Sequence, residues 1–298
     1  MALSRNLYST QFLTLELTEG GVNSDTISGL PVQTASIERT VPTEDVMVLG
    51  KLGSMGRQQK EVESVKVDIK LFWSSGERAN SSATAVTDTL QTRLTAANLS
   101  TLTGNALKGV RSKIVLSPNG FTAYGILTNF GIDAGVGDFL SANLSFAGFG
   151  TPEITTTAAA ADAESSYAPA SVFVYTSENV SLAGSTDETI KSAKFSIDIP
   201  NERLSRLGAP VSGSQTDANL TGNHLLVAKP PFKVSVSYDG ELVTGAHALD
   251  AITFGHLKIT PISANITTQS YNQNAGDVGA AFSFASEGTS CTFASVGP

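Results

Sequence analysis

The chain repeats one ten-residue stretch: Val41-Pro-Thr-Glu-Asp-Val-Met-Val-Leu-Gly50 aligns without a gap to Ile199-Pro-Asn-Glu-Arg-Leu-Ser-Arg-Leu-Gly208. Thr43 and Asn201 are good helix N-caps, and the closing glycine can take the left-handed conformation that often ends a helix. The repeat therefore predicts a short helical turn at the same place in two copies of one domain. The identical positions are Pro42, Glu44, Leu49 and Gly50 in the first copy and Pro200, Glu202, Leu207 and Gly208 in the second.

A second similarity closes each copy and follows the first in the same order. Ser145-Phe-Ala-Gly-Phe-Gly150 resembles Ser283-Phe-Ala-Ser-Glu-Gly288. The length of 298 residues is that of about two ordinary domains. We therefore predict a first domain at 1–153 and a second at 170–298, joined by a linker at 154–169 that is rich in Thr, Ala and Ser.

Alternating apolar residues predict that both copies are built from strands. The segment from Val62 to Phe72 places Val65, Val67, Ile69 and Leu71 on one face, and Phe232 to Tyr238 is its partner in the second copy. Further predicted strands are 13–17, 114–116, 124–130, 142–146, 172–175, 194–199, 257–260, 265–270 and 281–285.

One amphipathic helix is expected from Ser82 to Asn98, and the segment from Glu241 to Ile252 is shorter in the equivalent place. The predicted fold is mainly β: two tandem β-sandwich or barrel-like domains, each with one helix or short helical turn.

The composition argues against several classes of protein. Charged residues make up only 15% of the chain, against about 25% in typical soluble domains. The net charge is −8, and Lys and Arg form no cluster of the kind that grips duplex DNA. Residues Met1–Thr10 hold no apolar signal segment, and no run of about 18 apolar residues predicts a membrane span.

The sequence offers no constellation for catalysis, a metal or a cofactor. The glycine-rich stretch Gly50–Gly56 lacks the ending of a phosphate-binding loop, so it is interpreted as a flexible loop. Asp133 and Asp138 flank glycines without calcium-site spacing, which favours a β-turn. The histidines lie at no metal-binding spacing, and they are His224, His247 and His256.

Two single residues carry open alternatives. Cys291 is the one cysteine, so no internal disulfide is possible, and an inert buried thiol is favoured over intermolecular pairing. Trp73 ends the alternating strand and is either a contact anchor or a partly buried aromatic at a sheet edge.

Each copy thus runs through a strand, the motif Pro-x-Glu with its closing Leu-Gly, a loop, an alternating strand and a final Ser-Phe-Ala strand. This order resembles the major tail tube proteins of tailed bacteriophages, which are similar to the tubes of contractile injection systems. The resemblance implies that six domains form a ring, that inner strands close a barrel around a lumen, and that stacked rings conduct DNA. Two fused domains imply three chains in a pseudo-hexameric ring.

The resemblance also implies partners and contact residues. Sheath, tape-measure, terminator and baseplate proteins are suggested partners, in a virion tail assembled in the host cytoplasm, and DNA passes without specific binding. The loops Lys51–Glu61 and Ala209–Pro231 are expected to contact a neighbouring subunit or ring. The contact residues within them are Lys51, Arg57, Lys60, Asp217, His224 and Lys229.

Three other classes remain open at this point. A tandem β-sandwich binding or adhesion module would have the same strand pattern, but the chain has few aromatics and a single tryptophan for contacts. A different virion protein, such as a capsid decoration or terminator subunit, is the nearest rival. An enzyme on a β scaffold is disfavoured because no catalytic motif was found.

Overall fold

The computed structural model is almost entirely β. Of the residues that it describes, 82% lie in strands and none lies in a helix. All strand pairs are antiparallel. The prediction of a mainly β fold is confirmed. The described residues are 12–19, 22–30, 32–47, 49–50, 53, 55–59, 63–73, 111–117, 120–149, 151–155, 180–182, 189–205, 220–221, 224–229, 233–241, 251–255, 257–262, 265–272 and 281–295.

The strands follow one another along the whole described chain. They are β1 (Phe12–Glu19), β2 (Val22–Leu30), β3 (Val32–Thr40), β4 (Thr43–Asp45), β5 (Arg57–Gln59), β6 (Ser64–Phe72), β7 (Arg111–Ser117), β8 (Gly120–Gly135), β9 (Ser141–Phe149), β10 (Glu153–Thr155), β11 (Val180–Leu182), β12 (Thr189–Asp198), β13 (Asn201–Ser205), β14 (Leu220–Thr221), β15 (His224–Ala228), β16 (Lys233–Glu241), β17 (Ile252–Phe254), β18 (Leu257–Ile262), β19 (Asn265–Asn272), β20 (Ala281–Gly288) and β21 (Ser290–Ser295).

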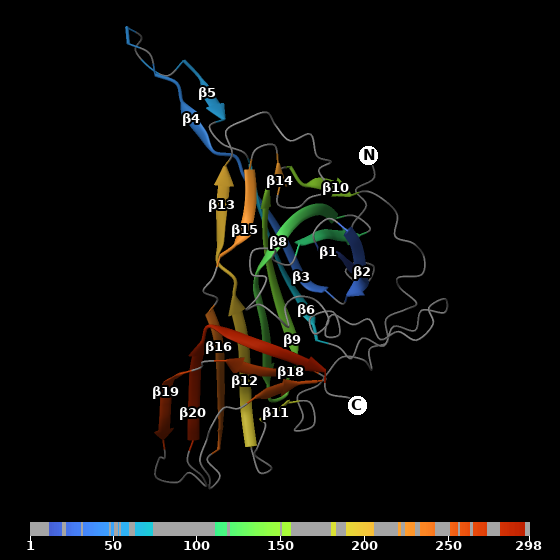
Figure 1. The fold of residues 1–298 in the computed structure, drawn as a ribbon, viewed down its shortest axis with the longest axis vertical. Helices are drawn as coiled ribbons and strands as arrows, with labels where there is room; N and C mark the ends of the chain where they lie inside the picture. The colour runs from blue at the N-terminus through green and yellow to red at the C-terminus, as the bar shows by residue number, and fades with distance from the viewer. Residues whose placement is uncertain are drawn as a thin grey trace, which may run out of the picture.

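One large sheet runs through both halves of the chain (Figure 1). Its main row, in spatial order, is β3-β6-β9-β8-β12-β16-β20-β19. The 16-residue strand β8 is the branch point, because its first half pairs with β7 and β10 while its second half pairs with β9 and β12. Beyond β7 the branch continues to β1 and β2.

A glycine marks the place where the sheet branches. A Cβ atom on Gly148, near the end of β9, would lie 1.9 Å from the backbone oxygen of Tyr124 in β8. Two backbones can approach that closely only where the side chain is a single hydrogen atom. The counterpart in the second half of the sheet is also a glycine, Gly288, which pairs with Val234 as Gly148 pairs with Val65.

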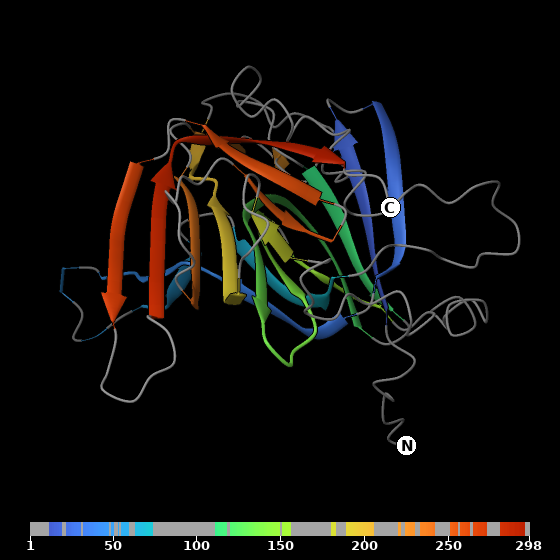
Figure 2. The same ribbon diagram turned by 90° about the horizontal axis from the view of Figure 1, so that it is seen from below.

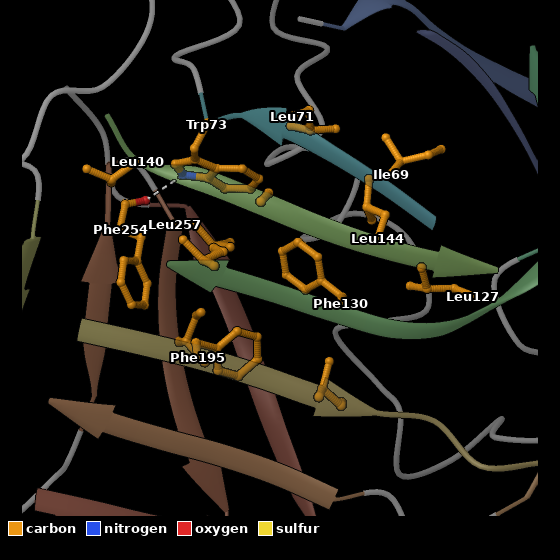
Figure 3. Packing of buried hydrophobic residues seen from close by; sticks show 14 of the residues in the cluster. Ile69, Leu71, Trp73, Leu127, Phe130, Leu140, Leu144, Phe195, Phe254 and Leu257 are labelled. Carbon is orange, nitrogen blue, oxygen red and sulfur yellow. Dashed lines mark hydrogen bonds between the residues drawn. The ribbon is translucent and has the colours of Figure 1, made fainter. Parts of the chain in front are cut away.

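A smaller sheet covers one face of the main row. It has the order β11-β17-β18-β21, and β18 and β21 run across the strands of the main row (Figure 2). The apolar side chains of β6, β8, β9 and β12 point toward it and form the core, as Figure 3 shows around Phe130 and Phe195. The alternation of Val65, Val67, Ile69 and Leu71 is confirmed, because all four are buried.

Trp73 ties the two sheets together. It is 1% exposed, and its indole Nε1–H donates a hydrogen bond of 3.0 Å to the carbonyl of Phe254 in β17 (Figure 3). Trp73 directly follows β6, which lies between β3 and β9 and is therefore not an edge strand. Both alternatives considered for Trp73, a contact anchor and a partly buried edge aromatic, are wrong.

The main row contains the same four-strand unit twice. The first unit is β3-β6-β9-β8 and the second is β12-β16-β20-β19. The decapeptide alignment, which places Val41 on Ile199, also places β3 on β12. In that alignment Val32 pairs with Leu71 as Ile190 pairs with Gly240, and Thr40 pairs with Ser64 as Asp198 pairs with Lys233. The two ladders therefore have the same register.

Irregularities in the ladders recur at matching positions. The first strand of each unit has a register shift, between Val32 and Thr34 in β3 and between Ile190 and Ser192 in β12. The last strand of each unit also has one, at Thr128 in β8 and at Thr267 in β19. Each of these threonines donates its hydroxyl to a carbonyl of the neighbouring strand, at 3.1 and 3.2 Å. Because bulges are specific features of a strand pair, their recurrence supports a duplicated unit.

The structure corrects three predictions. The decapeptide forms no helical turn, since its first part is strand β4 in the first unit and β13 in the second. The second similarity is out of register by two residues. The sequence comparison aligned Ser145 with Ser283, whereas the strand pairing aligns Ser145 with Ala285. The predicted loop Ala209–Pro231 contains strands β14 and β15.

Other predictions fall partly or wholly outside the described residues. These are the helix at 82–98, the strand at 172–175 and most of the linker at 154–169, of which Ile154 and Thr155 belong to β10. A division into domains at 1–153 and 170–298 stays a prediction, because one sheet and one core cluster span both halves.

The Trp73 hydrogen bond gives a stability prediction. Trp73→Phe leaves the buried carbonyl of Phe254 without this donor and also removes ring volume, so the free energy of unfolding should fall by about 2 kcal/mol. Equilibrium urea unfolding of the dilute protein measures the change. Ser235→Ala, on the opposite face of the main sheet, is the control and should change stability by less than about 0.5 kcal/mol. Equal midpoints for the two variants would show that the bond between the sheets contributes nothing.

Candidate assembly interface

The two four-strand units are joined edge to edge inside the chain. The last strand of the first unit, β8, pairs with the first strand of the second unit, β12. We call this pairing the internal joint. In it Ile132 lies opposite Phe195, and Phe130 lies opposite Ile197. The backbone N–H of Ile199 extends the ladder by donating to the carbonyl of Thr128 at 2.7 Å.

Side chains on both faces of the internal joint make contacts between β8 and β12. On the core face, the rings of Phe130 and Phe195 meet edge to face with centroids 5.9 Å apart. On the other face, Lys194 forms an ion pair with Asp133 at 3.3 Å. The Asn129 amide there also donates to the Asp198 carboxylate at 2.5 Å. The joint thus combines backbone pairing, aromatic packing and polar contacts.

The two ends of the main row are the counterparts of the two strands in this joint. At one end lies β3, which corresponds to β12, and at the other lies β19, which corresponds to β8. Among the described strands, β3 pairs only with β6 and β19 pairs only with β20. In the described part of the chain, one joint is therefore formed, between β8 and β12. The two strands that could form a second joint, β19 and β3, lie at opposite edges and are not paired with each other.

Exposed apolar side chains lie where the open halves would meet. Ile266 and Tyr271 in β19 are 54% and 55% exposed, and Val41 after β3 is 38% exposed. Their counterparts in the internal joint are Leu127, Ile132 and Ile199, which are at most 3% exposed. The same positions are thus buried where the joint is closed and accessible where it is open.

Strand β19 lacks the usual protection of a sheet edge. Its eight residues, Asn265 to Asn272, include no lysine and no proline, and all eight are exposed. Natural edge strands commonly use charge, proline or a covering segment to prevent pairing with another chain. An accessible edge without charge is a surface suited to strand addition.

The face of the main row that points away from the smaller sheet is polar, and we call it the open face. The residues whose side chains lie on the open face alternate along each strand with the core residues. Six carboxylates and four lysines lie among them. The charged residues are Glu38, Lys66, Asp68, Lys70, Asp133, Lys194, Asp198, Lys233, Asp239 and Glu287.

Most carboxylates of the open face have a donor close by. Lys66 lies 2.8 Å from Asp68, and Lys233 lies 2.8 Å from Glu287. Burial alone would raise the pKa of Asp68, but hydrogen bonds from Lys66 and Ser145 lower it below its usual range. The charges are therefore interleaved and locally balanced, and they form no basic track for a polyanion.

A hairpin arm extends from the first unit, beyond the end of β3. It consists of β4, β5 and the turn between them, and it projects past the upper end of the main sheet in Figure 1. The ladder continues past the strands, because the N–H of Val46 donates to the carbonyl of Gly56 and the N–H of Met55 donates to the carbonyl of Val46, both at 2.8 Å. Gly50 has φ +93°, so the expected left-handed glycine occurs in a turn of the hairpin and not at a helix end.

The second unit has an equivalent hairpin, β13–β15, which lies against the first unit. Thr43 pairs with Gln59 as Asn201 pairs with Ala228. Arg203 lies over the ring of Phe149 at the end of β9, 5.2 Å from the ring centroid. The base of this hairpin is thus part of the contact between the units.

The structure places three of the six predicted contact residues. Arg57 forms an exposed ion pair with Asp45 across the hairpin arm at 2.9 Å, and Lys229 pairs with Glu202 at 2.8 Å. His224 is the first residue of β15. Lys51, Lys60 and Asp217 lie outside the described residues. The sequence analysis did not select Ile266, Tyr271 or Val41 as contact residues. Their only distinguishing feature in the sequence is that each is an apolar residue in or beside a polar strand.

Within the described residues, no group of three His, Cys, Asp or Glu side chains could hold a metal ion. Asp138 lies in the expected turn, and its N–H donates to the Gly135 carbonyl at 3.0 Å. Over the same residues, no helix is long and apolar enough to cross a membrane. No protein-family model matches the chain, and no curated protein matches its sequence.

Cys291 gives a prediction about reactivity. Burial raises the pKa of its thiol to about 12, whereas a free cysteine has a pKa of about 8.5. In the native protein at pH 8, iodoacetamide should therefore alkylate Cys291 at least about 100-fold more slowly than in urea. Between about pH 8.5 and 12 the Cys291 thiol ionises in the unfolded chain but not in the folded one. The contribution of this thiol to the free energy of unfolding should therefore fall across that range. Gln58→Cys, on the exposed hairpin, supplies a control thiol that should react rapidly. Rapid alkylation of Cys291 itself in the folded protein would contradict this account.

Proposed function

We propose that the chain is a structural subunit that polymerises through its sheet edges into closed rings, and that the rings stack into a tube of a bacteriophage tail. The internal joint is the observation that carries the first part. Since β8 pairs with β12 inside the chain, β19 of one chain can pair with β3 of the next in the same register. The interface is head to tail and closes where the rotations add to a full turn.

We derive the register of the proposed contact between chains from that of the internal joint. By correspondence with Ile132 and Phe195, Tyr271 lies opposite Ile37 of the next chain. By correspondence with Ile199 and Thr128, the N–H of Val41 donates to the carbonyl of Thr267 in its neighbour. The contact would bury Ile266, Tyr271 and Val41, which are 38–55% exposed in the single chain, and removal of this apolar surface from water favours association.

Two units per chain support a ring of three chains. Six four-strand units, joined alternately inside and between chains, then form a continuous barrel that leaves no open edge. The open face is the lumen surface of this barrel, because the smaller sheet covers the other face. Its paired carboxylates and lysines give DNA no basic track to bind. The duplication and the order of motifs, which resemble those of tail tube proteins, support a tube that conducts DNA.

A pair of lysine substitutions in one strand tests the ring. Tyr271→Lys places a charge in the predicted contact with Ile37, so it should abolish rings. Ser270→Lys adds the same charge to the same strand on the open face, opposite Glu38 of the next chain, and should leave rings intact. Electron microscopy shows the rings, and mass measurement of the unmodified ring should give three chains of 30.9 kDa.

Two results would contradict the proposal. The first is equal ring formation by the two lysine variants, because the contact would then not use the core face of β19. The second is an unmodified protein that stays monomeric at high concentration in the presence of phage tail assembly factors.

A further inference from the structure

The proposed pairing of β19 with β3 of the next chain differs from the internal joint at its centre. In the internal joint Phe130 lies opposite Ile197, and both side chains are fully buried. The equivalent ladder positions place Gln269 of one chain opposite Arg39 of the next. The contact between chains therefore has a polar pair where the internal joint has an apolar one.

Both polar residues lie on the core face of their strands. Arg39 pairs with Val65, which is 4% exposed, and Gln269 pairs with Phe284, which is 2% exposed. Residues directly opposite each other in an antiparallel pair have Cβ atoms about 5 Å apart. The two side chains are therefore close enough for a direct hydrogen bond when the strands pair.

Arg39 is held in one orientation in the single chain. Its Nε and Nη2 donate to the two carboxylate oxygens of Glu63, at 2.7 and 2.5 Å. The Thr151 hydroxyl donates to the same carboxylate at 2.8 Å. The hydrogen bond from Arg39 lowers the pKa of Glu63 below its usual range, so this carboxylate stays ionised at neutral pH. The fixed guanidinium side chain is still 42% exposed, and its other N–H groups can donate to a neighbour.

Gln269 supplies the acceptor that this donor needs. Its amide nitrogen donates to the hydroxyl of Tyr271 at 2.5 Å, which orients the amide group. The amide oxygen can accept a hydrogen bond from a guanidinium, and hydrogen bonds to an ionised donor are stronger than those between neutral groups. The two edges thus carry complementary and oriented polar groups.

A polar pair at this place can specify the register of the strands. A slip by two residues keeps every side chain on its own face, so apolar alternation does not prevent it. Such a slip would place Gln269 opposite Ile37 or Val41, and Arg39 would be covered without this acceptor. Burial of a charged donor without a partner costs free energy, which disfavours the slipped pairing.

We propose that Arg39 of one chain and Gln269 of the next form a hydrogen bond that fixes the register of the contact between chains. This inference rests on the proposed function, since it needs β19 to pair with β3. Glu63 positions the guanidinium for this contact. The internal joint has no equivalent polar pair on its core face, because β8 and β12 belong to one chain and the rest of the fold aligns them.

Opposite charges at position 269 test the contact. Gln269→Glu keeps an acceptor and adds a charge complementary to Arg39, whereas Gln269→Lys places two like charges together. The concentration at which rings form should be at least about tenfold higher for the lysine variant than for the glutamate variant. Thr268→Glu and Thr268→Lys are matched controls on the open face, opposite Thr40, and should differ by less than about threefold.

Removal of the guanidinium separates this contact from a general effect of charge. In an Arg39→Met background, the difference between Gln269→Glu and Gln269→Lys should disappear or change sign, because Glu63 is then the nearest charge. Lys233→Met is the matched control, since it also removes an ion pair, of 2.8 Å with Glu287, but from the middle of the sheet. The difference between the two variants should persist in the Lys233→Met background.

Disulfide crosslinking reads the register directly. In a Cys291→Ala background, Ser270→Cys with Glu38→Cys should crosslink neighbouring chains, because these positions lie opposite each other. Ser270→Cys with Ser36→Cys should not, because a shift of two residues separates them beyond disulfide reach. Addition of Arg39→Met should allow the second crosslink, since slipped pairing is then no longer disfavoured.

The outcomes distinguish the inference from the function on which it rests. Equal ring formation by the two variants at position 269 overturns the Arg39–Gln269 contact and leaves the ring intact. A difference that persists unchanged with Arg39→Met does the same, and so does crosslinking that stays confined to position 38 in that background. Failure of the unmodified protein to form rings would instead overturn the proposed function.

Discussion

The antiparallel pairing of β8 with β12 is the contact on which the rest of the structure depends. It joins the last strand of one four-strand unit to the first strand of the next, so the two units follow one another in the same sheet. A sheet built this way always ends in two edges that match each other. Such a chain must protect its edges, pair them with another chain or aggregate. The polar, proline-free β19 and the exposed Tyr271 are consistent with controlled pairing.

The correspondence between β3 and β12 was predictable from the sequence, and the register of the later strands was predictable only in part. The decapeptide alignment correctly matched β3 with β12, because Pro42 and Pro200 occupy equivalent places between the strand and the hairpin that follows it. The Ser-Phe-Ala similarity was two residues out of register. A shift of two keeps every side chain on its own face, so alternation of apolar residues cannot detect it.

The strands that replace the predicted helical turns, and the open edges, could not be predicted from local sequence. Thr43 and Glu44 favour a helix start, but pairing with Gln58 and Gln59 holds them extended, and that partner lies beyond a long turn. Ile266 and Tyr271 stand in a strand of polar residues, and their meaning appears only by comparison with the buried Leu127 and Ile132. In the proposed ring these residues contact a second chain, and the sequence of one chain does not show where that neighbour lies.

Amide hydrogen exchange, followed before and after assembly, tests the central claim that the internal joint recurs between chains. Exchange should slow in β3 up to Val41 and in β19 from Thr267 to Asn272 when rings form. Exchange should stay unchanged in β16, which already lies between two strands. Assembly without new protection in β3 and β19 would contradict the claim, because the chains would then be joined through some other surface.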